Sequence, residues 1–103
     1  MSLDLTLQGA DERPVRWVSI GVEAHHRLLT LAGTLNLPLM DRLRDYYGDA
    51  TIEAAKLPEF LKEIQHIQIM LATDDALVPL LGDLQALIED AVQLDRPLKA
   101  LAD

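Results

Sequence analysis

The sequence predicts an α+β domain, in which a small antiparallel sheet is covered on one face by about four helices. Three patterns carry this prediction. Apolar residues alternate with polar ones over residues 2–8 and, weakly, over 97–102, β-branched and aromatic residues are concentrated at 15–20, and apolar residues recur every three or four residues from about 22 to 96. Alternation is typical of a half-buried strand, and the longer period is typical of an amphipathic helix. The alternative is an all-helical domain with an extended N-terminal arm.

The two N-terminal segments are predicted to pair as antiparallel strands, because only a short loop at residues 9–14 joins them. The apolar residues of the first segment share one face, and they are Leu3, Leu5 and Leu7. In the second segment, Trp17 falls on the face opposite to Val18 and Ile20. Residues 97–102 are interpreted as a third strand, since two strands alone form a marginal sheet. A frayed end is the alternative.

The first helix is predicted to run from about Val22 to Ala32. Gly33 then ends it as a left-handed residue, which leaves Leu35 in the following loop. The apolar residues of this segment cluster on one side when each residue turns by about 100°. They are Leu28, Leu29, Leu31, Ala32 and Leu35.

A second helix is predicted to begin at Pro38, because proline suits the first position of a helix. Gly48 is expected to end it. Residues 49–57 stay open between a strand, a helix and a loop. Thr51 and Ile52 favour a strand, whereas the residues that follow them are good helix formers.

Two longer helices complete the predicted fold. The third begins at Pro58 and extends to about Ala72. In the fourth, Pro79 is tolerated only in the first turn, and Pro97 ends the helix by Arg96. Three residues between these helices can accept the free N–H groups of a helix N-terminus. They are Thr73, Asp74 and Asp75.

Composition excludes several classes of protein. The 103 residues include 17 acidic and 9 basic side chains, for a net charge of −8, and no cysteine. A negative surplus disfavours a nucleic-acid partner, because that binding depends on Lys and Arg at phosphates. No apolar run of about 18 residues and no secretory-signal pattern occurs, so we expect one cytoplasmic domain without a membrane partner. Without cysteine there is no disulfide, thiolate metal site or cysteine nucleophile.

The sequence motifs of cofactor and metal sites are absent. The glycine-rich phosphate-binding patterns, the H-E-x-x-H zinc pattern and the G-x-S-x-G nucleophile pattern do not occur. The segment around Gly48 has some calcium-loop character. Its first and twelfth ligand positions would fall on Leu43 and Ala54, however, and neither side chain carries an oxygen. We therefore expect no cofactor and no metal ion.

The histidines are the candidates for acid–base or metal chemistry. His25 lies near the apolar face of the first helix. The adjacent His26 points about 100° away, so the two rings do not face one ion. One hypothesis is a small metal-dependent or acid–base enzyme, in which the catalytic His25 meets Asp45, Tyr46 or His66. The alternative is that His25 is a core-edge residue bonded to a backbone group and that His26 is solvated.

Two aromatic groups are candidates for contact with a protein partner. Tyr46 and Tyr47 follow two arginines, and arginine with tyrosine is common at interfaces. The alternative is a helix end whose tyrosines pack and reach water with their hydroxyls. Trp17 on the open face of the sheet indicates a contact surface, unless a loop or terminus covers it.

The negative charge is concentrated in the second half of the chain. Residues 1–50 hold five basic and seven acidic side chains, whereas residues 51–103 hold four and ten. In the fourth helix, Asp83 and Asp90 lie seven residues apart, hence on one face opposite the leucines, with Glu89 near them. This face is interpreted either as a docking surface for a basic partner or as a solvated face that aids solubility.

Ile69 and Met70 fall outside the apolar face of the third helix. By the helical period they lie about 150° and 110° from its centre. Such residues are either buried on a second side of the helix or part of a contact between two subunits. They motivate the hypothesis of a twofold homodimer.

The favoured hypothesis is a non-catalytic protein-binding module. It would use the acidic face of the fourth helix, with Trp17 or the Tyr46–Tyr47 surface as apolar anchors. In size and charge, through no shared motif, the chain resembles immunity proteins and other small inhibitors that neutralise basic toxins, and also many small bacterial proteins. The resemblance implies a basic protein partner. A structural homodimer and a small enzyme using His25 are the alternatives.

Overall fold

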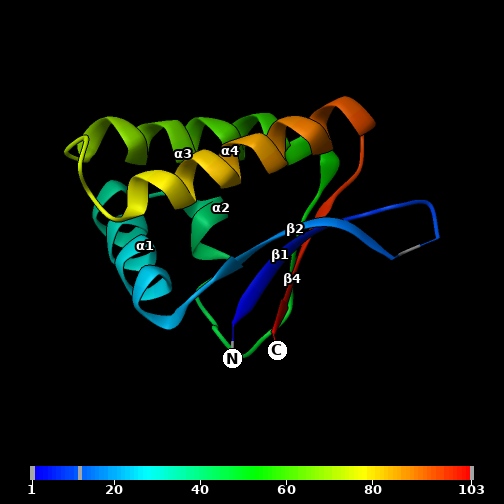
Figure 1. Ribbon diagram of the computed structural model, residues 1–103, viewed down its shortest axis with the longest axis horizontal. Helices are drawn as coiled ribbons and strands as arrows, with labels where there is room; N and C mark the ends of the chain where they lie inside the picture. The colour runs from blue at the N-terminus through cyan, green and yellow to red at the C-terminus, as the bar shows by residue number, and fades with distance from the viewer. Residues whose placement is uncertain (1, 12, 103) are drawn as a thin grey trace.

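The computed structural model describes residues 2–11 and 13–102, and it has the predicted α+β fold (Figure 1). The elements, in chain order, are β1 (Leu3–Gln8), β2 (Pro14–Ile20), α1 (Val22–Leu35), α2 (Pro38–Asp41), β3 (Ala50–Ile52), the 3-10 turn η1 (Ala54–Lys56), α3 (Leu57–Met70), α4 (Leu77–Leu94) and β4 (Leu98–Ala102). In Figure 1, α3 and α4 run antiparallel above the sheet, and α1 lies at their left end.

The strands form one antiparallel sheet in the order β2-β1-β4-β3. Leu5 of β1 lies opposite Val18 of β2 on one side and opposite Ala100 of β4 on the other. The predicted C-terminal strand is therefore confirmed, and it lies next to the first strand. Because Leu3 pairs with Ala102, the two ends of the described chain lie side by side (Figure 1).

Segment 49–57, which the sequence left open, contains a short strand and a 3-10 turn. β3 comes first and pairs with β4, with Ile52 opposite Leu98. The turn η1 follows and leads directly into α3. The sheet therefore has one strand more than the three that the sequence predicts.

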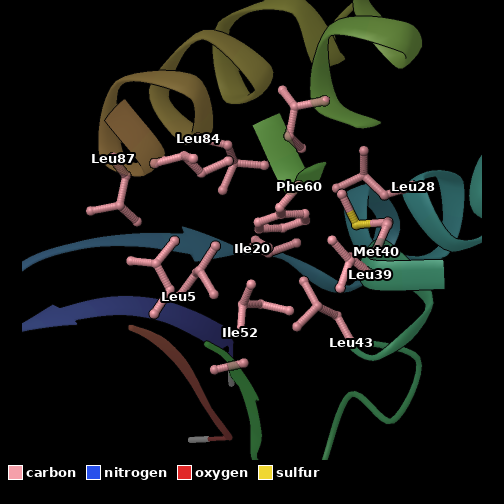
Figure 2. Close-up of a cluster of buried hydrophobic side chains, with 14 of the residues drawn as sticks. Leu5, Ile20, Leu28, Leu39, Met40, Leu43, Ile52, Phe60, Leu84 and Leu87 are labelled. Atoms are coloured by element: carbon pink, nitrogen blue, oxygen red, sulfur yellow. The ribbon is translucent and has the colours of Figure 1, made fainter. Parts of the chain in front are cut away.

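The core lies between the helices and one face of the sheet. The side chains of Leu3, Leu5 and Leu7 alternate onto this face and are fully buried. Phe60 of α3 lies in the middle of the cluster, among Ile20 of β2, Leu28 of α1, Met40 of α2 and Leu84 of α4 (Figure 2). Burying one such side chain contributes roughly 1.5–3 kcal/mol, so this cluster is the main source of stability.

The end of α1 lies further along the chain than predicted. Gly33 is inside the helix, and Leu35 is its last residue. Asn36 adopts the left-handed conformation, with φ 59°, and its N–H donates to the carbonyl of Ala32. Asparagine tolerates this conformation almost as glycine does. The extension brings Leu35 onto the core.

The predicted length of the second helix was wrong, because α2 ends at Asp41 rather than near Gly48. The chain continues in tight turns, in which the N–H of Leu43 donates to the carbonyl of Met40. The N–H of Tyr47 would bond to the carbonyl of Leu43 in a longer helix. It donates instead to Oδ1 of Asp45, 2.9 Å away. The carbonyl of Leu43 is thereby left for a tertiary partner.

The two long helices begin and end close to the predicted residues. Oδ1 of Asp75 accepts the N–H of Leu77, 2.9 Å away, at the start of α4. Asp75 is thus the one of the three expected capping residues that bonds the new helix. At the other end, Asp95 adopts the left-handed conformation, with φ 52°, and α4 stops before Pro97.

Candidate protein-interaction surface

His25 is buried and is bonded to the backbone. Its side chain is 7% exposed, and its Nε2 donates to the carbonyl oxygen of Leu43, 2.6 Å away. The ring also packs edge-on against Tyr46, with 4.9 Å between the ring centroids. His26 is exposed. This is the arrangement of a core-edge histidine with a backbone partner.

The aromatic pair at residues 46 and 47 is divided between core and surface. Tyr46 is buried, and its hydroxyl donates to the carbonyl of Ile20, 3.3 Å away. The prediction that Tyr46 forms part of a partner surface was therefore wrong, because its ring fills the space beside His25. Tyr47 is 68% exposed and packs edge-on against Tyr46, with 5.4 Å between the ring centroids. Tyr47 alone stays available to a partner.

Glu63 is a buried carboxylate that the sequence patterns did not indicate. It is 8% exposed and lies on the buried side of α3. Its two carboxylate oxygens accept the N–H groups of Leu39 at 3.1 Å and Met40 at 2.8 Å. These are free donors in the first turn of α2, and Pro38 before them has no N–H. The sequence does contain a signal for this burial. Glu63 lies one turn from Phe60 and from Ile67, within the apolar stripe of the helix.

The acidic face predicted on α4 is narrower than expected. Asp90 forms an ion pair with Arg16 of β2, on the side of the sheet that faces the helices. It therefore lies on the flank of α4 rather than opposite the leucines. Asp83 and Glu89 are exposed, and they make no ion pair with any residue in the described ranges. Two of the three predicted carboxylates remain without an internal partner.

Trp17 lies on the open face of the sheet, as predicted, and is 59% exposed. The strand register places it opposite Thr6, and Thr6 opposite Lys99. Thr6 is only 3% exposed although no helix covers this face. Its larger neighbours on both sides therefore shield it. The hydroxyl of Thr6 donates to the carbonyl of Lys99, 2.9 Å away.

Ile69 and Met70 are exposed at the end of α3, and Ile69 is 79% exposed. Of the two outcomes left open by the sequence, burial on a second side is thereby excluded. A pocket of about 300 Å³ lies near this end of the molecule, with its lining formed by His26, Arg27, Thr30, Leu31 and Leu71. It is lined by one charged side chain, and that guanidinium is already bonded to Asp75.

Two ion pairs elsewhere in the fold shift the pKa of a carboxylate. The Arg27 guanidinium donates to both carboxylate oxygens of Asp75, each at 2.8 Å. Together with the N–H of Leu77, it lowers the pKa of Asp75 from 3.8 to about 2. In the same way, the Arg42 guanidinium lowers the pKa of Glu53. The first pair connects α1 to the start of α4, and the second connects the end of α2 to the residue between β3 and η1.

Residues 2–11 and 13–102 hold no group of three or more His, Cys, Asp or Glu side chains that could share a metal ion. Within the same residues, no helix has the length and hydropathy of a membrane-spanning segment. Comparison with protein-family models, curated protein sequences and solved structures finds no match for this chain. A proposal about function therefore depends on the exposed side chains and charges of the described residues.

Proposed function

We propose that this chain is a non-catalytic protein-binding module whose partner is a basic protein. The observation that carries the proposal is the difference in pairing between arginines and carboxylates. Each arginine in residues 13–44 has a carboxylate partner within the fold, and the pairs are Arg13–Asp11, Arg16–Asp90, Arg27–Asp75, Arg42–Glu53 and Arg44–Asp41.

The sixth arginine is also bonded within the fold. Arg96 donates to the carbonyl oxygens of Gln8 at 3.3 Å and Gly9 at 2.8 Å. Five of the 17 acidic side chains take part in the ion pairs with the other five arginines. The net charge of −8 comes from the other carboxylates, after the charges of Arg96 and the three lysines are subtracted. Asp83 and Glu89 on the exposed side of α4 are two of them. A surface of this kind attracts a positively charged protein and speeds its association.

A charge-reversal pair tests this proposal. Asp83→Lys/Glu89→Lys reverses the charge of the two α4 carboxylates that make no ion pair with a described residue, and it leaves the Arg16–Asp90 pair in place. Glu23→Lys/Glu59→Lys makes the same change of net charge at exposed carboxylates on α1 and α3. Proteins captured from the native lysate at low salt should bind the wild type and the second variant, and should be lost from the first. Equal capture by the two variants would contradict a site on α4.

A homodimer is the second candidate function, and the exposure of Ile69 and Met70 favours it. Two adjacent exposed apolar side chains at a helix end are suited to a twofold contact. Sedimentation velocity up to high micromolar concentration tests it. A dimer that is lost in Ile69→Lys would support this candidate, whereas a single 11.5 kDa species at every concentration would refute it.

A further inference from the structure

β2 is a terminal strand of the sheet, and its outer edge has no strand neighbour within the described residues. It has seven residues, whereas β3 at the opposite edge has three. Pro14, Val15, Arg16 and Trp17 are all exposed in this strand. The unpaired N–H and C=O groups of an edge strand can bond to an added strand, so β2 is the edge with room for one.

The geometry of β2 limits the usable part of this edge. Its pairing with β1 is regular from Arg16 to Ile20, and the register shifts beyond Arg16, where Gln8 lies opposite Pro14. A shift of this kind bends the strand and interrupts its pairing. The regular stretch from Arg16 to Ile20 is therefore the part that can accept another strand.

The two sides of this edge have different chemistry. On the helix side, Asp90 of α4 is paired with Arg16. Asp83 precedes Asp90 by seven residues, which is about two helical turns, so it lies on the same flank of α4. Asp83 is exposed and makes no ion pair with a described residue. On the other side, Trp17 presents an exposed aromatic ring.

We propose that the edge of β2 binds an extended, basic segment of the partner protein, which adds to the sheet as a further strand. Side chains of an added strand alternate between the two sides. Those on the helix side meet the flank of α4, where Asp90 is already paired with Arg16 and Asp83 supplies the unpaired carboxylate. Those on the open side meet Trp17. The segment therefore alternates Lys or Arg with apolar residues. This inference rests on the proposed function and specifies the conformation of the partner.

Charge favours a basic segment over a second copy of this chain at the edge of β2. Twofold pairing of two β2 strands would bring the Asp83–Asp90 flank of each α4 toward that of the other copy. Like charges at such a junction disfavour association, and each copy also carries a net charge of −8. A basic strand meets the same flank with the opposite charge.

The probe is an equimolar mixture of nine-residue peptides, with Lys at every second position and Val, Leu, Thr or Tyr between them. Binding is followed at low salt through the amide signals of the ¹⁵N-labelled protein and the indole signal of Trp17. We expect the largest shifts in β2 and in the indole group. The tightest peptide is then prepared in two N-methylated forms, each blocking alternate N–H groups.

The two N-methylated forms separate strand addition from simple charge attraction. An added strand bonds β2 through one set of alternate N–H groups only. One form should therefore lose affinity by at least about tenfold, because several backbone hydrogen bonds are removed. The other form should bind like the parent peptide. Equal affinities of the two forms overturn the inference.

Protein variants separate this inference from the proposed function. Trp17→Ala and Asp83→Lys should each weaken the parent peptide by about five- to tenfold, and the control Glu59→Lys should not. Asp83→Lys could abolish binding while the two N-methylated forms bind the wild type equally. That result would support a basic partner and would overturn strand addition. Failure of the whole mixture to bind also overturns strand addition. The charge-reversal capture experiment then decides on the basic partner independently.

Discussion

Glu63 and Glu89 are identical side chains on neighbouring helices, and their surroundings are opposite. Glu63 is buried on α3, with both oxygens bonded to N–H groups of α2. Glu89 is exposed on α4, and no ion pair in the described residues includes it. The first carboxylate connects two helices and belongs to the fold. The second contributes no such connection, so its charge is free to act on another molecule.

Among these variants, the largest change in stability is expected at the buried carboxylate, Glu63. Glu63→Ala should lower the free energy of unfolding by about 3 kcal/mol, because it leaves two buried N–H groups without an acceptor. Urea denaturation at neutral pH measures the change. The control Glu59→Ala, one turn earlier and exposed, should change stability by less than about 0.5 kcal/mol. Similar losses in both variants would mean that the carboxylate of Glu63 does not hold α2.

A second buried group should show an intermediate effect. His25→Ala removes the hydrogen bond to Leu43 and the edge-on contact with Tyr46, and should destabilise the fold by about 2 kcal/mol. The adjacent His26→Ala should be nearly neutral, since His26 is exposed. Thermal unfolding of the two variants makes the comparison. A neutral His25→Ala would show that the buried ring is dispensable to the fold.

The Arg27–Asp75 pair should make a smaller contribution that depends on pH. The folded-state pKa of Asp75 is about 2, lower than its ordinary value of 3.8. The stabilisation is therefore fully present above 3.8 and is lost as the pH falls through about 2. An NMR titration of the Asp75 carboxyl carbon should show this low pKa in the wild type. In Arg27→Gln it should return toward 3.8, and an unchanged value would exclude the guanidinium as its main cause.

The smallest effect on stability is expected at the exposed carboxylates. Asp83→Asn/Glu89→Gln should change the free energy of unfolding by less than about 0.5 kcal/mol, since neither group has a partner to lose. A slight gain is expected as repulsion along α4 is relieved. Urea denaturation at low salt tests this. A decrease in the free energy of unfolding of more than about 1 kcal/mol would show that Asp83 and Glu89, like Glu63, stabilise the fold.

Periodicity predicted the elements of this fold well because burial is regular along each of them. The alternation of Leu3, Leu5 and Leu7 is carried directly onto the core face of β1. The register of β4 follows from the same rule, although its weak alternation left a frayed end open. Where one face of an element is buried throughout, the pattern of side chains determines the structure.

The features that periodicity missed depend on contacts between distant residues. α2 is short because the carbonyl of Leu43 bonds His25 and because Tyr46 packs inward. The acceptor role of Glu63 depends on the N-terminus of α2 lying against α3, which no local pattern specifies. Asp90 turned toward Arg16 for the same reason. The position of Trp17 was predictable because it depends only on alternation within β2.

The central strands of the sheet come from opposite ends of the chain. β1 is the first element and β4 is the last, and β4 is the strand neighbour of both β1 and β3. A ribosome makes β1, β2 and β3 long before it makes residues 98–102. Until those residues emerge, β3 has no strand to join, and β1 keeps an open edge in the middle of the future sheet. The sheet can therefore be completed only after residues 98–102 have been made.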